Sequence, residues 1–129
     1  MILLGIDGGA THTRAALISE TGAILGYGIS GPSNYDNVGV EIAKANIREA
    51  VQHAWSETDL KSPKADAAYL GMAGVVSESD RATIRQIVVA LKLVKENKIA
   101  VDHDIRIALA GGLAGAEGIV LIDRSDSRG

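Results

Sequence analysis

The positions of apolar and polar residues change period along the chain, from short strand-like runs to a helical spacing. In the N-terminal part, β-type runs predict three strands at Ile2 to Ile6, Thr11 to Ser19 and Ala23 to Ile29. The turns between these segments are short and contain glycine. Consecutive strands joined by such turns are typical of an antiparallel meander.

Beyond residue 39 the pattern alternates between helices and strands. From Ile47 to Trp55, apolar residues recur at i, i+3, i+4, i+7 and i+8, which predicts a helix over Val40 to about Glu57. The continuous apolar run Ala67 to Met72 predicts a strand buried on both faces. A second helix is predicted from Ser77, where Asp80 gives the spacing of a capping box. The remaining predicted elements are a strand at Ile99 to Val101, a helix at Asp104 to Leu113 and a strand at Ile119 to Ile122.

In chain order these elements read β-β-β-α-β-α-β-α-β. A meander followed by alternating helices and strands predicts an α/β domain with a mixed sheet and helices on its faces. The order is similar to that of the ribonuclease H-like fold, which actin-like ATPases use twice. A chain of 129 residues is long enough for one compact domain and not for two, so residues 1–129 are predicted to form a single domain.

Composition and charge narrow the classes of function. The net charge of −3 gives no electrostatic reason to expect nucleic acid or an anionic membrane as a partner. The sequence has no cysteine, which excludes disulfides and thiolate metal sites within it. Its apolar runs are too short to span a bilayer, and Asp7 interrupts the first of them, so we expect no signal peptide and a cytoplasmic protein.

The first chemical motif is the glycine-rich segment from Leu4 to Arg14. A β-hairpin with small residues at its tip can bring backbone N–H groups close to phosphate oxygens, and the hydroxyls of Thr11 and Thr13 would add donors. Asp7, at the end of a strand beside that tip, can hold a hydrated Mg²⁺. The alternative is a simple glycine hairpin in which Asp7 only closes the turn. Neither of the two common glycine-rich nucleotide motifs is present.

Two further glycine-containing segments are candidates for binding polar ligands. Ser30 to Gly39 is predicted to be a polar loop, and the side-chain amide of Asn34 within it can both donate to and accept from vicinal hydroxyls. The alternative is an ordinary turn, since Pro, Ser and Asn are common turn residues. Small residues at Gly71 to Gly74 would let backbone approach a ligand, or would simply make a tight exit from the strand.

Asp104 is the candidate general base. It follows a short predicted strand and starts a predicted helix, where a carboxylate can accept a proton from a hydroxyl that attacks a γ-phosphate. The alternative is that Asp104 is only a helix N-cap, and both roles can hold together. Asp102 is the alternative base, whereas His103 is expected to be structural or solvated.

The segment Asp7 to Arg14 resembles the first phosphate motif of the superfamily of actin, heat-shock chaperones and sugar kinases. Within it, the chain is similar to the family of N-acetylglucosamine kinases, glucosamine kinases, archaeal hexokinases and BadF/BadG-type ATPases, from Ile2 to Ile122. The resemblance implies ATP and Mg²⁺ as cofactors, and a small-molecule sugar and a nucleotide as partners. It implies nucleotide phosphate contacts from Gly8, Gly9, Ala10, Thr11, His12, Thr13 and Arg14. It implies sugar contacts from Asn34, Tyr35, Gly74 and Asp104, with Asp104 as the catalytic base and Asp7 at the metal.

The resemblance breaks at the end of the chain. Where the family has a second glycine-rich phosphate loop, this sequence has Asp123 to Gly129, and the C-terminal domain that supplies the adenosine pocket in the family is not among the 129 residues. We therefore expect an N-terminal actin-like ATPase domain without its partner domain, with weak turnover or none. An unpaired domain face would favour self-association, which adds a homodimer to the expected partners. The alternatives to a sugar kinase are a BadF/BadG-type activator ATPase and a non-catalytic half-domain.

Overall fold

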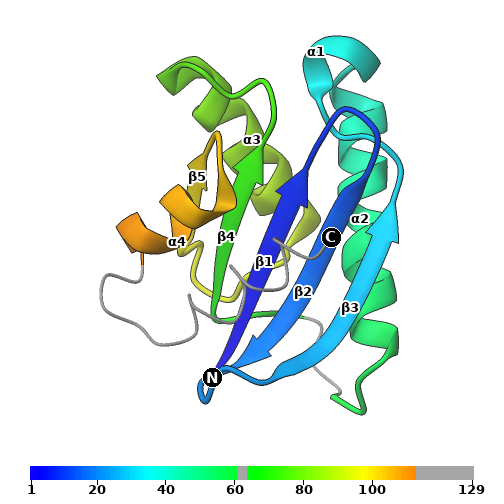
Figure 1. Cartoon of the computed structure of the whole chain (residues 1–129), viewed down its shortest axis with the longest axis vertical. Helices are drawn as coiled ribbons and strands as arrows, with labels where there is room; N and C mark the ends of the chain where they lie inside the picture. The colour runs from blue at the N-terminus through cyan, green and yellow to red at the C-terminus, as the bar shows by residue number, and fades with distance from the viewer. Residues whose placement is uncertain (61–63, 113–129) are drawn as a thin grey trace.

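A computed structural model describes residues 1–60 and 64–112 (Figure 1). Five strands form one sheet in the order β3-β2-β1-β4-β5. The strands are β1 (Ile2–Gly8), β2 (Thr13–Ser19), β3 (Ile24–Ser30), β4 (Ala67–Met72) and β5 (Ile99–Asp102). The pairs β1–β2 and β2–β3 are antiparallel, whereas β1–β4 and β4–β5 are parallel. The meander and the mixed sheet are therefore confirmed. The strand predicted at 119–122 lies outside the described residues.

The helices cover the two faces of the sheet unequally (Figure 1). They are α1 (Tyr35–Val38), α2 (Val40–Ser56), α3 (Glu78–Leu91) and α4 (Ile105–Gly112). The main apolar core joins α2 and α3 to one face of the sheet. A smaller core joins α4 to the other face, against β1 and β4. None of the described helices is long and apolar enough to cross a membrane.

Glycines let α2 lie directly against β3. A Cβ atom added to Gly26 would lie 2.0 Å from the carbonyl oxygen of Ala54, and one added to Gly28 would lie 2.1 Å from that of Ala50. These glycines therefore serve a close approach of backbone to backbone. The apolar stripe predicted for this helix is confirmed, because its buried residues are Ala43, Ile47, Ala50, Val51 and Ala54.

The helix starts agree with the sequence except in one loop, and the end predicted for the last helix, at residue 113, lies outside the described residues. Ser77 and Asp80 form the predicted capping box at the start of α3. The predicted polar loop over 30–39 instead contains the single-turn helix α1, separated from α2 by Gly39 with φ +89°. A four-residue helix has no room for an apolar stripe, so the periodicity of the sequence did not indicate it.

Alternation along the strands decides which residues meet α4. Leu3 of β1 and Tyr69 of β4 belong to the core on the α4 face. Because side chains two residues apart in a strand share a face, Asp7 and Gly71 also lie on the α4 face, at the carboxyl ends of their strands. The register confirms this placement, since Asp7 pairs with Gly71.

Candidate functional site

The predicted site segments all follow strands that end at the same edge of the sheet (Figure 1). β1, β3, β4 and β5 run in the same direction, because β2 is antiparallel to both of its neighbours and the other pairs are parallel. Their carboxyl ends lead into the hairpin tip at 9–12, the loop at 31–34, the loop at 73–77 and the start of α4. Ligands of open α/β sheets bind outside the carboxyl ends of the strands. The topology thus brings four separate segments to one edge.

Backbone hydrogen bonds tie the hairpin tip to two of these loops. The N–H of Ser33 donates to the carbonyl oxygen of Gly9 at 3.2 Å, and the N–H of Ala73 donates to that of Gly8 at 2.8 Å. The tip itself is closed by a bond from the N–H of Gly9 to the carbonyl oxygen of His12 at 2.9 Å. The hairpin and the two predicted sugar-side loops therefore form one connected structure.

A pocket opens on the hairpin. Its volume is about 190 Å³, and it is lined by Asp7, Gly9, Thr11, His12 and Arg14. Asp7 pairs with Arg14 across β1 and β2, so both side chains leave the same face of the sheet. Within the described part of the chain, the backbone N–H groups of residues 10–12 have no protein acceptor. Backbone donors, a guanidinium and an imidazole beside one carboxylate suit a phosphate group accompanied by a cation. Ala10 lies at the exposed tip, outside the pocket lining.

Thr13 corrects one expectation. Its side chain is completely buried on the α2 side of the sheet, so its hydroxyl does not face the pocket. The hydroxyl donates to the carbonyl oxygen of Gly31 at 2.7 Å and lies 2.7 Å from the hydroxyl of Ser33. Since a hydroxyl carries a single proton, Ser33 donates in the second of these bonds. The Thr13 side chain therefore supports the neighbouring loop. Gly8 belongs with it, because an added Cβ would lie 2.4 Å from the Ser33 oxygen.

Asn34 and Gly74, both predicted to contact the sugar, lie together although they are far apart in sequence. An added Cβ at Gly74 would lie 2.7 Å from the Asn34 Oδ1 atom, and Gly74 has φ +91°. The Asn34 Oδ1 atom is buried and has no hydrogen-bond partner among the described residues. A buried acceptor without a partner is costly, so a ligand donor that reached it would lower the free energy of the site.

The side chain of Tyr35 is held by contacts within the protein. Its hydroxyl donates to the Asp80 carboxylate, and its ring packs against the main core. This hydrogen bond raises the pKa of Tyr35 and lowers that of Asp80. Tyr35 thus connects α1 to the first turn of α3, and its direct contact with a sugar remains a prediction.

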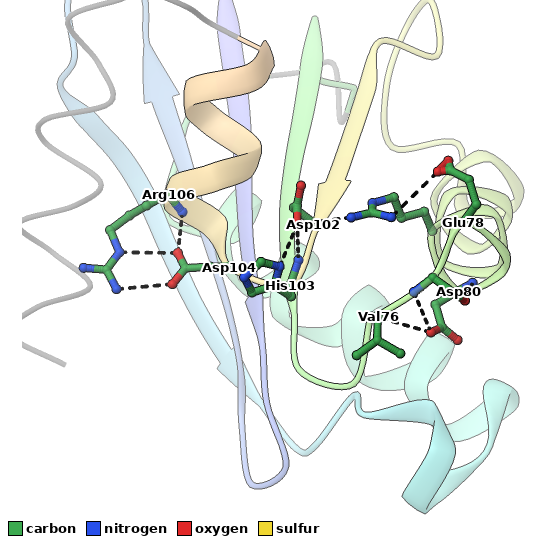
Figure 2. Close-up of polar contacts among 9 residues, drawn as sticks. Val76, Glu78, Asp80, Asp102, His103, Asp104 and Arg106 are labelled. Carbon is green, nitrogen blue, oxygen red and sulfur yellow. Dashed lines mark hydrogen bonds and ion pairs between the residues drawn. The ribbon is translucent and has the colours of Figure 1, made fainter.

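Asp104 stands at the start of α4 with its carboxylate turned toward Arg106 (Figure 2). Oδ1 accepts from the Arg106 backbone N–H at 2.7 Å and from its Nε at 3.3 Å, and Oδ2 accepts from Nη2 at 3.2 Å. These bonds hold the pKa of Asp104 below its ordinary value. The Asp104 side chain remains 32% exposed. Asp104 is therefore both an N-cap and an ionised, accessible carboxylate.

Asp102, the alternative base, is held by other partners (Figure 2). Its Oδ1 accepts from the His103 backbone N–H at 2.8 Å, and it lies 2.8 Å from His103 Nδ1 and 3.4 Å from Arg81 Nη2. The His103 backbone bond, followed by the charge of Arg81, lowers the pKa of Asp102. These contacts fix the end of β5 to α3, which favours a structural role for Asp102.

The strand register places Asp7 and Asp104 near each other. Asp7 pairs with Gly71, and Gly71 pairs with Asp102 on its other side. Because Gly71 has no side chain, the start of α4 lies directly against it. A Cβ atom added there would lie 2.6 Å from the Asp104 carbonyl carbon. Adjacent strands are about 4.8 Å apart, so Asp7 and the start of α4 occupy neighbouring positions on one face.

Sequence reasoning missed two residues that hold the site together. Arg106 pairs with Asp104, and its position two residues after an aspartate that starts a helix was a usable signal. Asp80 was predicted only as a cap, and nothing in the sequence indicates its bond to Tyr35, which is 45 residues away.

The parallel core strands with an antiparallel meander, and helices on both faces of the sheet, have the arrangement of the actin-like ATPase fold. A solved structure of an N-acetylglucosamine kinase candidate from Chromobacterium violaceum has this fold, with a TM-score of 0.59 at 22% identity over 78% of this chain and 34% of that one. Residues 4–129 match the BadF/BadG/BcrA/BcrD ATPase family, and the chain belongs to this family.

Two curated relatives are sugar kinases by name. The chain is 32% identical to the N-acetyl-D-glucosamine kinase of Dictyostelium discoideum over 129 positions, which cover 94% of this chain. It is 29% identical to the N-acetylmuramic acid/N-acetylglucosamine kinase of Clostridium acetobutylicum over 125 positions, which cover 97% of this chain. The chain spans about 40% of the length of each of these relatives.

Proposed function

We propose that this domain binds the phosphates of ATP at its N-terminal hairpin and presents a hexose or amino sugar for phosphorylation. The observation that carries the proposal is the meeting of a pocket at the glycine hairpin, a carboxamide oxygen without a partner and an accessible carboxylate at one sheet edge. Family membership and the names of the two curated relatives support the same substrate classes.

In this proposal the hairpin residues Gly9, Thr11, His12 and Arg14 contact phosphate oxygens, and Asn34 and Gly74 contact the sugar. Asp104 accepts the proton of the attacking sugar hydroxyl. A carboxylate with a lowered pKa is a weak base, but it is ionised at neutral pH. Phosphoryl transfer depends mainly on positioning and on charge stabilisation, so a weak, well-held base is sufficient.

Asp7 fits a magnesium ion that arrives with the nucleotide. Among the described residues, no three acidic or histidine side chains are grouped to hold a metal by themselves. Mg²⁺ keeps several waters and binds through one or two carboxylates together with substrate phosphates, which matches the single carboxylate in the pocket lining. Bound there, the ion would neutralise phosphate charge.

We further propose that the chain forms the phosphate and sugar half of a two-domain cleft. The adenosine side would come from a second domain of the kind that the family has. Closure of two domains around their substrates excludes water from the reaction, so a domain acting alone is expected to bind better than it turns over.

The test combines sugar binding by calorimetry with ADP release in a coupled assay, using Mg·ATP and a panel of hexoses and amino sugars. ADP release that depends on sugar supports a kinase. Sugar binding without ADP release supports the proposed sugar site and indicates that turnover requires the second domain. ADP release without sugar would favour an activator-type ATPase, and the absence of both signals would refute the proposal in favour of a non-catalytic domain.

Replacing Asp104 with Asn tests the base directly. The change removes the proton acceptor while leaving a side chain that can still cap α4, so turnover should fall about 10²- to 10⁴-fold with sugar affinity retained. The matched control is Asp36→Asn, which changes an exposed aspartate of α1. Unchanged turnover in the Asp104 variant would rule out its role as the base.

A further inference from the structure

Two loops carry the predicted sugar contacts, and one side chain joins them. The first loop leads through Asn34 into α1, and the second runs from Gly74 to the start of α3. Asp80, in the first turn of α3, bonds to both of them. Neither the capping box nor the proposed chemistry requires the connection to the first loop.

The bonds of Asp80 are divided between its two oxygens. Oδ2 accepts from the backbone N–H of Val76 at 3.0 Å and from that of Ser77 at 3.2 Å, which fixes the end of the Gly74 loop (Figure 2). Oδ1 accepts from the hydroxyl of Tyr35, the residue directly after Asn34. One carboxylate therefore holds both loops, and as an ionised acceptor it makes stronger bonds than a neutral group would.

The distance between the two loops determines the position of the Asn34 carboxamide. Asn34 Oδ1 is buried against Gly74 with no partner among the described residues. An amide held without a partner needs support from its surroundings, because an unconstrained side chain would turn toward water. The bond between Tyr35 and Asp80 supplies a support one residue from Asn34.

We propose that Asp80 is a positioning residue of the sugar site, acting through Tyr35 to hold the Asn34 carboxamide against the Gly74 loop in the geometry that binds sugar. The inference rests on the proposed function, since it assigns the ligand of that same site. The phosphate pocket is lined by other residues and does not depend on this connection.

The test is the affinity for N-acetyl-D-glucosamine in four single variants. Tyr35→Phe removes only the hydroxyl and keeps the ring in the core, and Asp80→Asn keeps an oxygen for the cap. The controls are Tyr27→Phe, which changes an exposed tyrosine of β3, and Glu78→Gln, which changes an exposed acid in the same helical turn.

Tyr35→Phe and Asp80→Asn should each weaken sugar binding about tenfold, the size of a charge-assisted hydrogen bond. The double variant should be no weaker than the weaker single variant, because both changes act on the same bond, which in Asp80→Asn loses its charged acceptor. Affinity for Mg·ATP, and both control variants, should stay within about twofold of the wild type, which is the precision of such comparisons.

Two results would overturn the inference. If Tyr35→Phe binds sugar with wild-type affinity, the bond between Tyr35 and Asp80 has only a structural role, whether or not the melting temperature falls. The proposed function would then remain intact. Failure of the unmodified chain to bind any sugar in the panel would remove the proposed function, and this inference with it.

Discussion

A single methyl group added at Gly71 should displace the candidate catalytic residue Asp104 while leaving the rest of the fold in place. Gly71 lies on the α4 face of β4, paired with Asp7 on one side and with Asp102 on the other. A Cβ atom there would lie 1.9 Å from the Ile105 nitrogen, whereas the tightest real contacts of such an atom are 3.0–3.4 Å. In Gly71→Ala the first turn of α4, with Asp104, must therefore move by about 1 Å or more, because the obstruction is backbone and has no flexible end to turn aside.

Two magnitudes follow from that displacement. Overpacking of this kind costs about 1–3 kcal/mol of stability. A misplacement of about 1 Å at a reacting group costs about 10²-fold in rate. Turnover should therefore fall far more than sugar affinity, since the displaced group is Asp104 and the proposed sugar contacts of Asn34 and Gly74 lie on other loops.

The measurements are urea denaturation of Gly71→Ala and the coupled ADP-release assay with a saturating sugar. Gly9→Ala is the control for stability, because its added Cβ would meet only the His12 carbonyl oxygen, at an ordinary 3.5 Å. The stability of that variant should stay within about 0.5 kcal/mol of the wild type, as is usual for unstrained surface changes. A Gly71 variant with wild-type stability would refute the close approach of α4, and wild-type turnover in a displaced α4 would refute the role of Asp104.

Two further predictions concern α3 and α4. Ser77→Ala should lower the unfolding free energy by about 1 kcal/mol through loss of the α3 cap. The measurement is denaturant unfolding, with Ser79→Ala as the control. Equal losses of unfolding free energy in the two variants would contradict the role of Ser77 as the N-cap. Arg106→Gln should raise the pKa of Asp104 toward the ordinary value near 3.9, measured from its carboxyl carbon by NMR. Because the folded-state pKa is depressed, the stability from Asp104 is complete above that ordinary value and is lost as pH falls through the folded pKa. The Arg106 variant should therefore lose less stability on acidification, and an unchanged carboxyl titration would contradict the pairing.

Much of this fold follows from patterns that act over short stretches of chain. The six-residue strand β4 reads as a continuous apolar run because it is buried on both faces. The α3 start was predictable because Ser77 and Asp80 satisfy each other within one turn. The helix α1 was not predictable in this way, because its one turn is stabilised by tertiary contacts of Tyr35 with Asp80 and with the core.

The candidate site was harder to predict, because it depends on contacts across the sheet. The sequence indicated Asp7, Asn34, Gly74 and Asp104 as single positions of interest. Their grouping needed the parallel register of β1, β4 and β5, which no local pattern contains. The approach of Gly74 to Asn34 likewise joins residues whose separation in sequence leaves no periodic signal.

Strand alternation also explains why a contiguous motif divides into two kinds of residue. Asp7 and Arg14 face the pocket side of the sheet, whereas Thr13 is buried on the opposite side against Gly31 and Ser33. Successive residues of a strand must point to opposite faces, so a strand-borne phosphate motif can present only about half of its side chains to a ligand. The other half is available to fix the adjacent loop, and in this domain the Thr13 hydroxyl does so. The same hairpin thereby lines the proposed phosphate pocket and supports the loop that leads to the proposed sugar contact, so hydrogen bonds join the two proposed binding segments.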